Sequence, residues 1–122
     1  MVWHSSLSKK NKRDLERVQK VAVKVIMGKN YTSYKAGLEM LKIENLDKRR
    51  ERLCLNFAKK SIQNEKAGKL FPKNVSKHSM KKRRTKKFKP RITKTTRYQK
   101  SAIPYLINLL NKDEEKQKEQ MK

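Results

Sequence analysis

An α-helix is most clearly indicated by residues 8–28, SKKNKRDLERVQKVAVKVIMG. Apolar side chains recur there at the spacing of three and four residues that lines one helical face: Leu15, Val18, Ala22, Val25 and Ile26. Ser8 is a suitable N-cap, and Gly28 supplies the left-handed residue with which many helices end. We therefore predict a helix from Lys9 to Met27 with this apolar face turned inward.

The same helix carries a basic stripe on another side. Its members are three or four residues apart and therefore adjacent on the helix surface: Lys10, Arg13, Arg17, Lys20 and Lys24. Two interpretations stay open, a solvated face and a surface for phosphate groups. Under the second, Arg13, Arg17, Lys20 and Lys24 are candidate nucleic-acid-binding residues.

Two further helices are predicted before residue 72. Ser33 can cap a short helix that ends at Leu41, and a longer helix runs from about Asn45 to Gln63. On the longer helix the predicted inner face consists of Leu46, Leu53 and Phe57, flanked by Cys54. Because the connections are short, we expect an all-α fold in which residues 1–72 form a small three-helix bundle.

The C-terminal part predicts one more short helix. Ser101 is a plausible cap, and apolar residues recur in an amphipathic pattern until Asn111. Residues 101–111 are thus expected to return to the bundle as a helix. Residues 112–122 alternate in charge and lack apolar anchors, which predicts a frayed extension of this helix or a charged tail.

Between these parts lies a segment of a single charge sign. From Lys73 to Lys100 the sequence has thirteen Lys and Arg residues and no Asp or Glu. High charge of one sign with few apolar residues predicts disorder, so residues 73–100 are expected to be a disordered basic arm. We expect this arm to bind RNA or DNA. Phosphates would neutralise its cations, and unpaired bases would stack on Phe88 and Tyr98. The candidate binding residues of the arm are Lys81, Lys82, Arg83, Arg84, Lys86, Lys87, Phe88, Lys89, Arg91, Arg97 and Tyr98.

Composition narrows the class of protein. The chain has 122 residues, a formal net charge of +24 and one cysteine, Cys54, so no internal disulfide can form. No apolar run has the length of about 20 residues that spans a bilayer, and residues 1–7 lack the order of a signal peptide. The run from Lys81 to Lys89 is dense enough for a nuclear import signal. We expect an intracellular, nuclear protein without a membrane partner.

No pattern of residues predicts catalysis, a metal site or a cofactor. Cys54, His4 and His78 are scattered singly, whereas a zinc site needs several such ligands at close spacing. Asp14 and Asp47 fall within predicted helices beside basic residues, as helix ion pairs do. We therefore expect no enzyme activity from this chain.

An ordered set of segments nevertheless resembles a known family. These segments are VWHSSL (2–7), DLERVQK (14–20), YTSY (31–34), RRE (49–51), LC (53–54), FAKK (57–60), LFP (70–72) and SAIPYL (101–106). In this order they are similar to the C-terminal region of reverse transcriptases encoded by jockey-like retrotransposons without long terminal repeats.

The resemblance implies a non-catalytic C-terminal fragment of an RNA-directed DNA polymerase, because the family's metal-binding aspartates lie in an upstream domain. It also implies a grip on template or target nucleic acid. Two alternatives stay open: a helical protein-interaction module that docks on the polymerase domain or on a second copy, and a retroelement remnant with no independent function.

Overall fold

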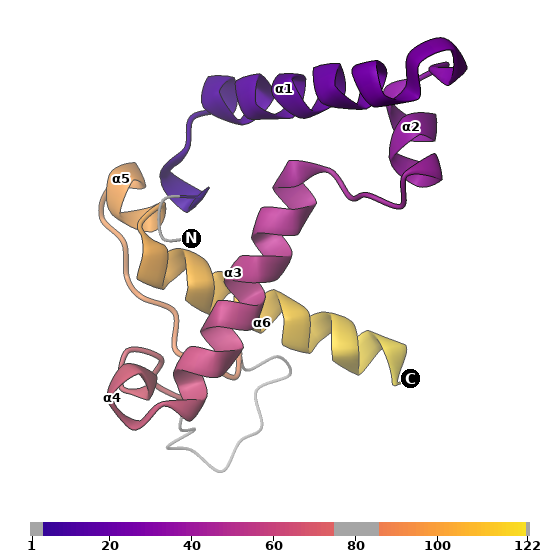
Figure 1. The fold of residues 1–122 in the computed structure, drawn as a ribbon. Coiled ribbons are helices and arrows are strands. Elements are labelled where there is room, and N and C mark those ends of the chain that lie inside the picture. Colours follow the sequence, from indigo (N-terminus) through magenta and orange to yellow (C-terminus); the bar gives the residue numbers. More distant parts are fainter. Residues whose placement is uncertain (1–3, 75–85, 122) are drawn as a thin grey trace. The chain divides into compact units, whose positions relative to one another are not determined.

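The computed structural model describes residues 4–74 and 86–121, and these residues are all-α, which confirms the predicted fold class (Figure 1). Six α-helices are described: α1 (Lys9–Met27), α2 (Tyr34–Met40), α3 (Leu46–Gln63), α4 (Glu65–Gly68), α5 (Thr96–Gln99) and α6 (Ala102–Gln120). Two 3-10 helices, η1 (His4–Ser6) and η2 (Gly28–Asn30), precede and follow α1 in the chain.

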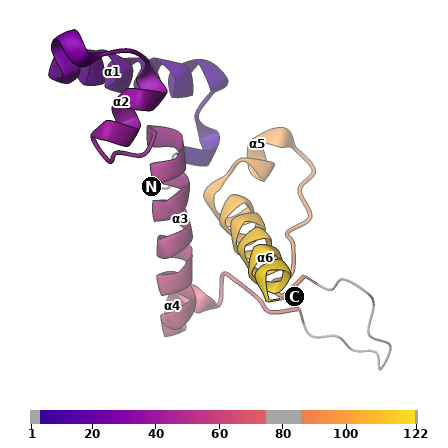
Figure 2. The ribbon, with the colours of Figure 1, turned by 90° about the vertical axis from the view of Figure 1, so that its right-hand side faces the viewer.

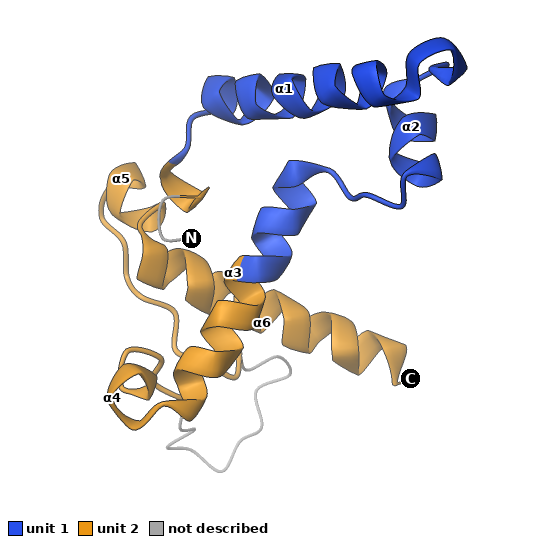
Figure 3. Cartoon of the chain, in the orientation of Figure 1, with its two compact units in different colours: residues 1, 7–53 blue, residues 2–6, 54–122 orange. Residues whose placement is uncertain are grey.

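The described residues divide into two compact units (Figure 3). Among the described residues, unit 1 comprises residues 7–53, and unit 2 comprises residues 4–6, 54–74 and 86–121. Helix α3 contributes its first part to unit 1 and its second part to unit 2. The predicted grouping of residues 1–72 into one bundle therefore differs from the structure, because the second part of α3 shares a core with α6.

Both ends of α1 lie where the sequence predicts them. The Ser8 side chain accepts a hydrogen bond of 3.1 Å from the backbone N–H of Asn11. Gly28 has a φ of +52°, and its N–H donates to the carbonyl of Lys24. Local capping chemistry thus fixes this helix at both ends.

The buried face of α1 is not the predicted one. Val23 is only 2% exposed, whereas Val18 and Val25 of the predicted inner face are 69% and 75% exposed. At 100° per residue around the helix axis, Val23 lies roughly 110° from the centre of the predicted inner face. The physical reason lies in α2: Gly37 brings its backbone so close to Val23 that an added Cβ would lie 2.6 Å from Val23 Cγ1.

Helices α2 and α3 begin as predicted, but the inner face of α3 also differs. Ser33 caps α2 by accepting from the N–H of Ala36 at 3.2 Å. On α3, Cys54 and Ala58 are buried, whereas Phe57 is 48% exposed. Cys54 and Ala58 belong to the same buried cluster as side chains of α6, which lies beside this part of α3 within unit 2 (Figure 2).

Unit 2 is built around one apolar cluster. Its buried members are Cys54, Ala58, Phe71, Phe88, Leu106, Ile107, Leu109 and Leu110. The 3-10 helix η1 adds His4, which is 2% exposed and meets the Tyr105 ring edge-on at a centroid distance of 5.9 Å.

Helix α6 extends well past the predicted end at Asn111. Residues 112–120 are helical, so this part of the chain is an extension of α6, one of the two predicted alternatives, and not a separate charged tail. Ion pairs support the extension: Lys59 reaches Asp113 at 2.8 Å, and Lys87 pairs with Glu114. Gln117 also donates to Asp113 at 3.0 Å, four residues away on the same helix.

The described residues of the predicted arm, 73–74 and 86–100, are ordered. The Asn74 N–H donates to the carbonyl of Lys87 at 2.8 Å, and the Lys89 N–H donates to the carbonyl of Pro72 at 2.9 Å. This antiparallel bridge and helix α5 show that residues 86–100 take defined positions, which corrects the prediction of disorder for that part. Residues 75–85 of the predicted arm lie outside the described residues.

Candidate nucleic-acid interface

The predicted binding cations fall into three groups. Lys81, Lys82, Arg83 and Arg84 lie outside the described residues. Five predicted cations lie in the described part of the arm, belong to unit 2 and are all exposed: Lys86, Lys87, Lys89, Arg91 and Arg97. The cations predicted on α1 belong to unit 1 and are likewise exposed: Arg13, Arg17, Lys20 and Lys24. Each unit therefore presents its own basic surface.

Phe88 does not belong to a binding surface. Its side chain is only 3% exposed and lies in the core of unit 2. The prediction that its ring stacks on unpaired bases is therefore wrong. A buried aromatic ring gains more from apolar contact with the core than it would from a solvated position in the arm.

Asn111 holds this part of the arm in place. Its side-chain oxygen accepts from the Phe88 N–H at 3.0 Å, and its side-chain nitrogen donates to the Phe88 carbonyl at 3.1 Å. Asn111 itself is 4% exposed. We call this pair of hydrogen bonds the Asn111 clip. The sequence analysis did not predict these two hydrogen bonds. The sequence signal for them is the amide residue at the end of an apolar helical strip, because a buried amide needs hydrogen-bond partners.

Tyr98 remains available for the predicted role. It lies on α5, where Thr95 caps the helix by accepting from the Tyr98 N–H at 3.2 Å. The side chain is 43% exposed. An exposed ring of this kind can stack on an unpaired base.

Some of the cations already have carboxylate partners. Lys87 pairs with Glu114, and its ammonium lies 5.9 Å from the centroid of the Phe88 ring. Arg52 pairs with Glu44, with a hydrogen bond of 3.0 Å from its Nε. Such exposed pairs contribute little stability, so a phosphate can replace the carboxylate at small cost.

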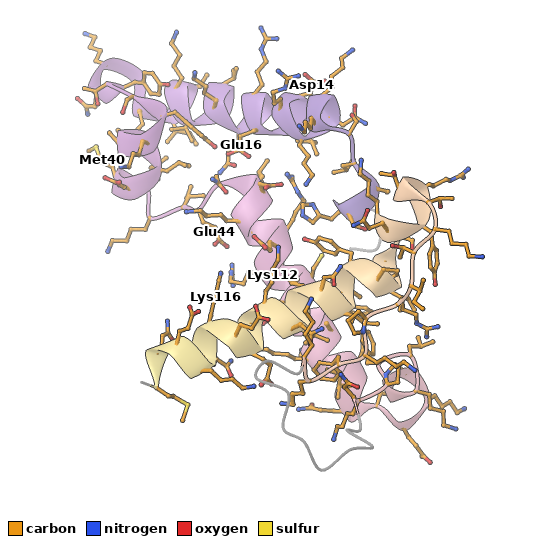
Figure 4. The ribbon with its side chains drawn as sticks, turned by 180° about the vertical axis from the view of Figure 1, so that it is seen from behind. Asp14, Glu16, Met40, Glu44, Lys112 and Lys116 are labelled. Atoms are coloured by element: carbon orange, nitrogen blue, oxygen red, sulfur yellow. The ribbon has the colours of Figure 1, made fainter. Side chains whose placement is uncertain are left out.

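Within unit 1, one carboxylate organises the interior. Glu16 accepts from the Tyr34 hydroxyl at 2.5 Å and from the Leu46 N–H at 3.1 Å. Figure 4 shows Glu16 on the side of α1 that faces the rest of its unit. Burial, together with the hydrogen bond to Glu16 and its negative charge, raises the pKa of Tyr34. Sequence reasoning missed this contact because it joins three separate segments.

The extension of α6 adds cations that the sequence analysis did not single out. Lys112 and Lys116 are exposed and lie four residues apart, on the same side of α6 (Figure 4). Asp113 and Glu114 of the same helix are engaged with Lys59 and Lys87. The helix thus offers exposed ammonium groups beside carboxylates that are already paired.

Within residues 4–74 and 86–121, no three His, Cys, Asp or Glu side chains gather to hold a metal ion. No helix in this part of the chain is both long and apolar enough to cross a membrane. Comparisons with known protein families, with curated proteins and with solved structures find no match to this chain.

Proposed function

We propose that this chain binds RNA or DNA through the phosphate backbone, without base specificity and without catalysis. The observation that carries the proposal is the segment from Lys73 to Lys100, with thirteen cations and no carboxylate of its own. All of its cations that the structure describes are exposed to solvent. The resemblance to the C-terminal region of jockey-like reverse transcriptases supports the same proposal, in which the chain is a non-catalytic part of such a polymerase.

The mechanism is the release of counterions. Each neutralised phosphate of a duplex contributes about −0.9 to the slope of log affinity against log salt concentration, so about six contacts give a slope near −5. Tyr98 adds a stacking contact that favours unpaired bases over duplex, because only an unpaired base exposes its face. Phe88 makes no such contribution.

The first experiment removes four arm cations together. We expect the variant K81A/K82A/R83A/R84A to bind a fluorescent single-stranded RNA about 100-fold more weakly at low salt. The slope of log affinity against log salt concentration should become shallower by up to about 3, because each of the four lost contacts contributes about 0.7 on a single strand. Fluorescence anisotropy over a salt series measures both quantities. The matched control, K9A/K29A/K35A/K69A, removes the same charge from exposed positions elsewhere.

The control separates binding by the arm from attraction by total charge. Under the proposal it loses far less affinity than the arm variant does. Equal losses in the two variants would show that net charge alone draws the nucleic acid. If the unchanged chain failed to bind either RNA or DNA in dilute buffer, the proposed function would be wrong.

A further inference from the structure

Helix α1 exposes a continuous apolar stripe. Its members are Val18, Val21, Ala22, Val25 and Ile26, which we call the α1 stripe. The four larger side chains are 57–75% exposed. Counted from Val18, the positions are i, i+3, i+4, i+7 and i+8, the spacing with which a helix anchors itself in a groove of another protein. Large apolar side chains gathered on one exposed face mark an interaction site.

Unit 1 does not use the α1 stripe for its own packing. The side of α1 that packs within the unit carries Val23 against Gly37 of α2, and Glu16 with its two hydrogen bonds. Gln19 on this side donates to the carbonyl of Glu44 at 3.2 Å. The stripe therefore lies outside the contacts that hold unit 1 together.

The charges beside the stripe restrict what can cover it. Val21 has Arg17 one turn before it and Lys24 one turn after it, so one edge of the stripe is basic. Only two acidic residues lie on α1, and one of them, Glu16, is occupied by Tyr34 and Leu46. An apolar surface with such an edge matches a partner whose apolar groove is bordered by Asp or Glu.

The same charges argue against other occupants. A second copy would bring another formal charge of +24 against the same basic edge, and like charges in contact oppose association. A nucleic acid supplies the negative charge but no apolar groove for valine and isoleucine side chains. We propose that the α1 stripe is a docking surface for a protein partner that presents an acidic, amphipathic helix.

The test uses the full chain and a synthetic amphipathic helical peptide with leucines along one face and glutamates beside them. Its comparison peptide carries lysines in place of the glutamates. The chain variant V18S/V25S removes two anchors without changing charge. The matched control, I92S, removes a side chain that is 90% exposed in unit 2. Fluorescence anisotropy at physiological ionic strength measures binding of each peptide.

We expect the acidic peptide to bind, V18S/V25S to weaken it by roughly tenfold or more, and I92S to leave it unchanged. The lysine peptide should not bind. Equal binding by V18S/V25S and the unchanged chain would overturn the proposal, because the peptide would then be held by cations alone. This result is independent of RNA binding by the arm, which V18S/V25S leaves intact.

Three further measurements distinguish a protein partner from internal packing, from a second copy and from a lipid surface. A lower thermal midpoint of V18S/V25S in circular dichroism, relative to I92S, would show that the stripe packs within the chain and would overturn the proposal. Sedimentation equilibrium that reveals a dimer, abolished by V18S/V25S, would assign the stripe to a second copy instead. Binding of the unchanged chain but not the variant to anionic vesicles, without binding of the acidic peptide, would assign it to a lipid surface instead.

Discussion

Replacing Asn111 by alanine removes both hydrogen bonds of the clip and leaves the N–H and carbonyl of Phe88 without these partners. The bonds measure 3.0 Å and 3.1 Å, and Asn111 is 4% exposed, so water cannot easily take its place. A buried polar group left without its partner costs about 1–3 kcal/mol, so we expect the two groups together to lower the free energy of unfolding by about 2–6 kcal/mol. Asn111→Asp should also destabilise, since a carboxylate cannot donate to the Phe88 carbonyl.

The assay is unfolding in urea followed by circular dichroism, together with hydrogen exchange of the Phe88 amide. Asn108→Ala is the matched control, because Asn108 lies one turn earlier on α6 and is exposed. We expect it to change the free energy by about 0.5 kcal/mol or less. If Asn111→Ala and Asn108→Ala unfolded at the same urea concentration and the Phe88 amide exchanged equally slowly in both, the clip would contribute nothing to stability.

Two predictions concern unit 1. Gly37→Ala places a Cβ 2.6 Å from Val23 Cγ1, and overpacking of about 1–3 kcal/mol should outweigh the gain of about 1 kcal/mol from alanine in a helix, so urea unfolding should show a less stable protein. A more stable variant would show that α2 has room beside Val23. Tyr34→Phe removes the hydroxyl that donates to Glu16 and should cost about 1–2 kcal/mol near neutral pH. Because the pKa of Tyr34 is raised from its usual value of 10.0, this stability is present in full below pH 10 and is lost as the pH rises towards the pKa of the folded state. Urea unfolding at pH 8 and pH 11 should therefore show a smaller difference between the two proteins at pH 11, and a constant difference would contradict the role of Glu16.

The parts of the fold that the sequence predicted depend on neighbouring residues in the chain. The ends of α1 follow from Ser8 and Gly28, and the start of α2 follows from Ser33. Each cap acts within one turn of its own helix, so its effect can be read from spacing and residue type. These boundaries required no knowledge of what packs against the helix.

The parts that could not be predicted depend on contacts between distant residues. The apolar pattern of α1 predicted that Val18 and Val25 would be buried. In the structure Val23 is buried instead, because the backbone of α2 approaches it closely at Gly37. The ring of Phe88 was assigned to the basic arm by its neighbours in sequence, whereas Asn111, 23 residues away, fixes it in a core. In both cases a close backbone approach or a buried amide outweighed the local pattern.

The distribution of acidic residues links the fold to the proposed function. Of the eleven acidic residues in the chain, Glu44, Asp47, Asp113 and Glu114 form ion pairs in the described part, and Glu16 holds Tyr34 and Leu46. All five lie outside the segment from Lys73 to Lys100, which has no carboxylate of its own.

The cations of this segment outnumber the carboxylates that reach them within the described structure, where Glu114 meets Lys87. The bridge between Lys73 and Phe88 and the Asn111 clip hold the described part of the segment in place on unit 2. A nucleic acid that binds the cations of this part would therefore not have to pay the entropic cost of ordering its backbone. Under the proposed function, the buried Phe88 is lost as a stacking group but would aid binding in another way, by fixing the backbone that carries Lys86, Lys87 and Lys89.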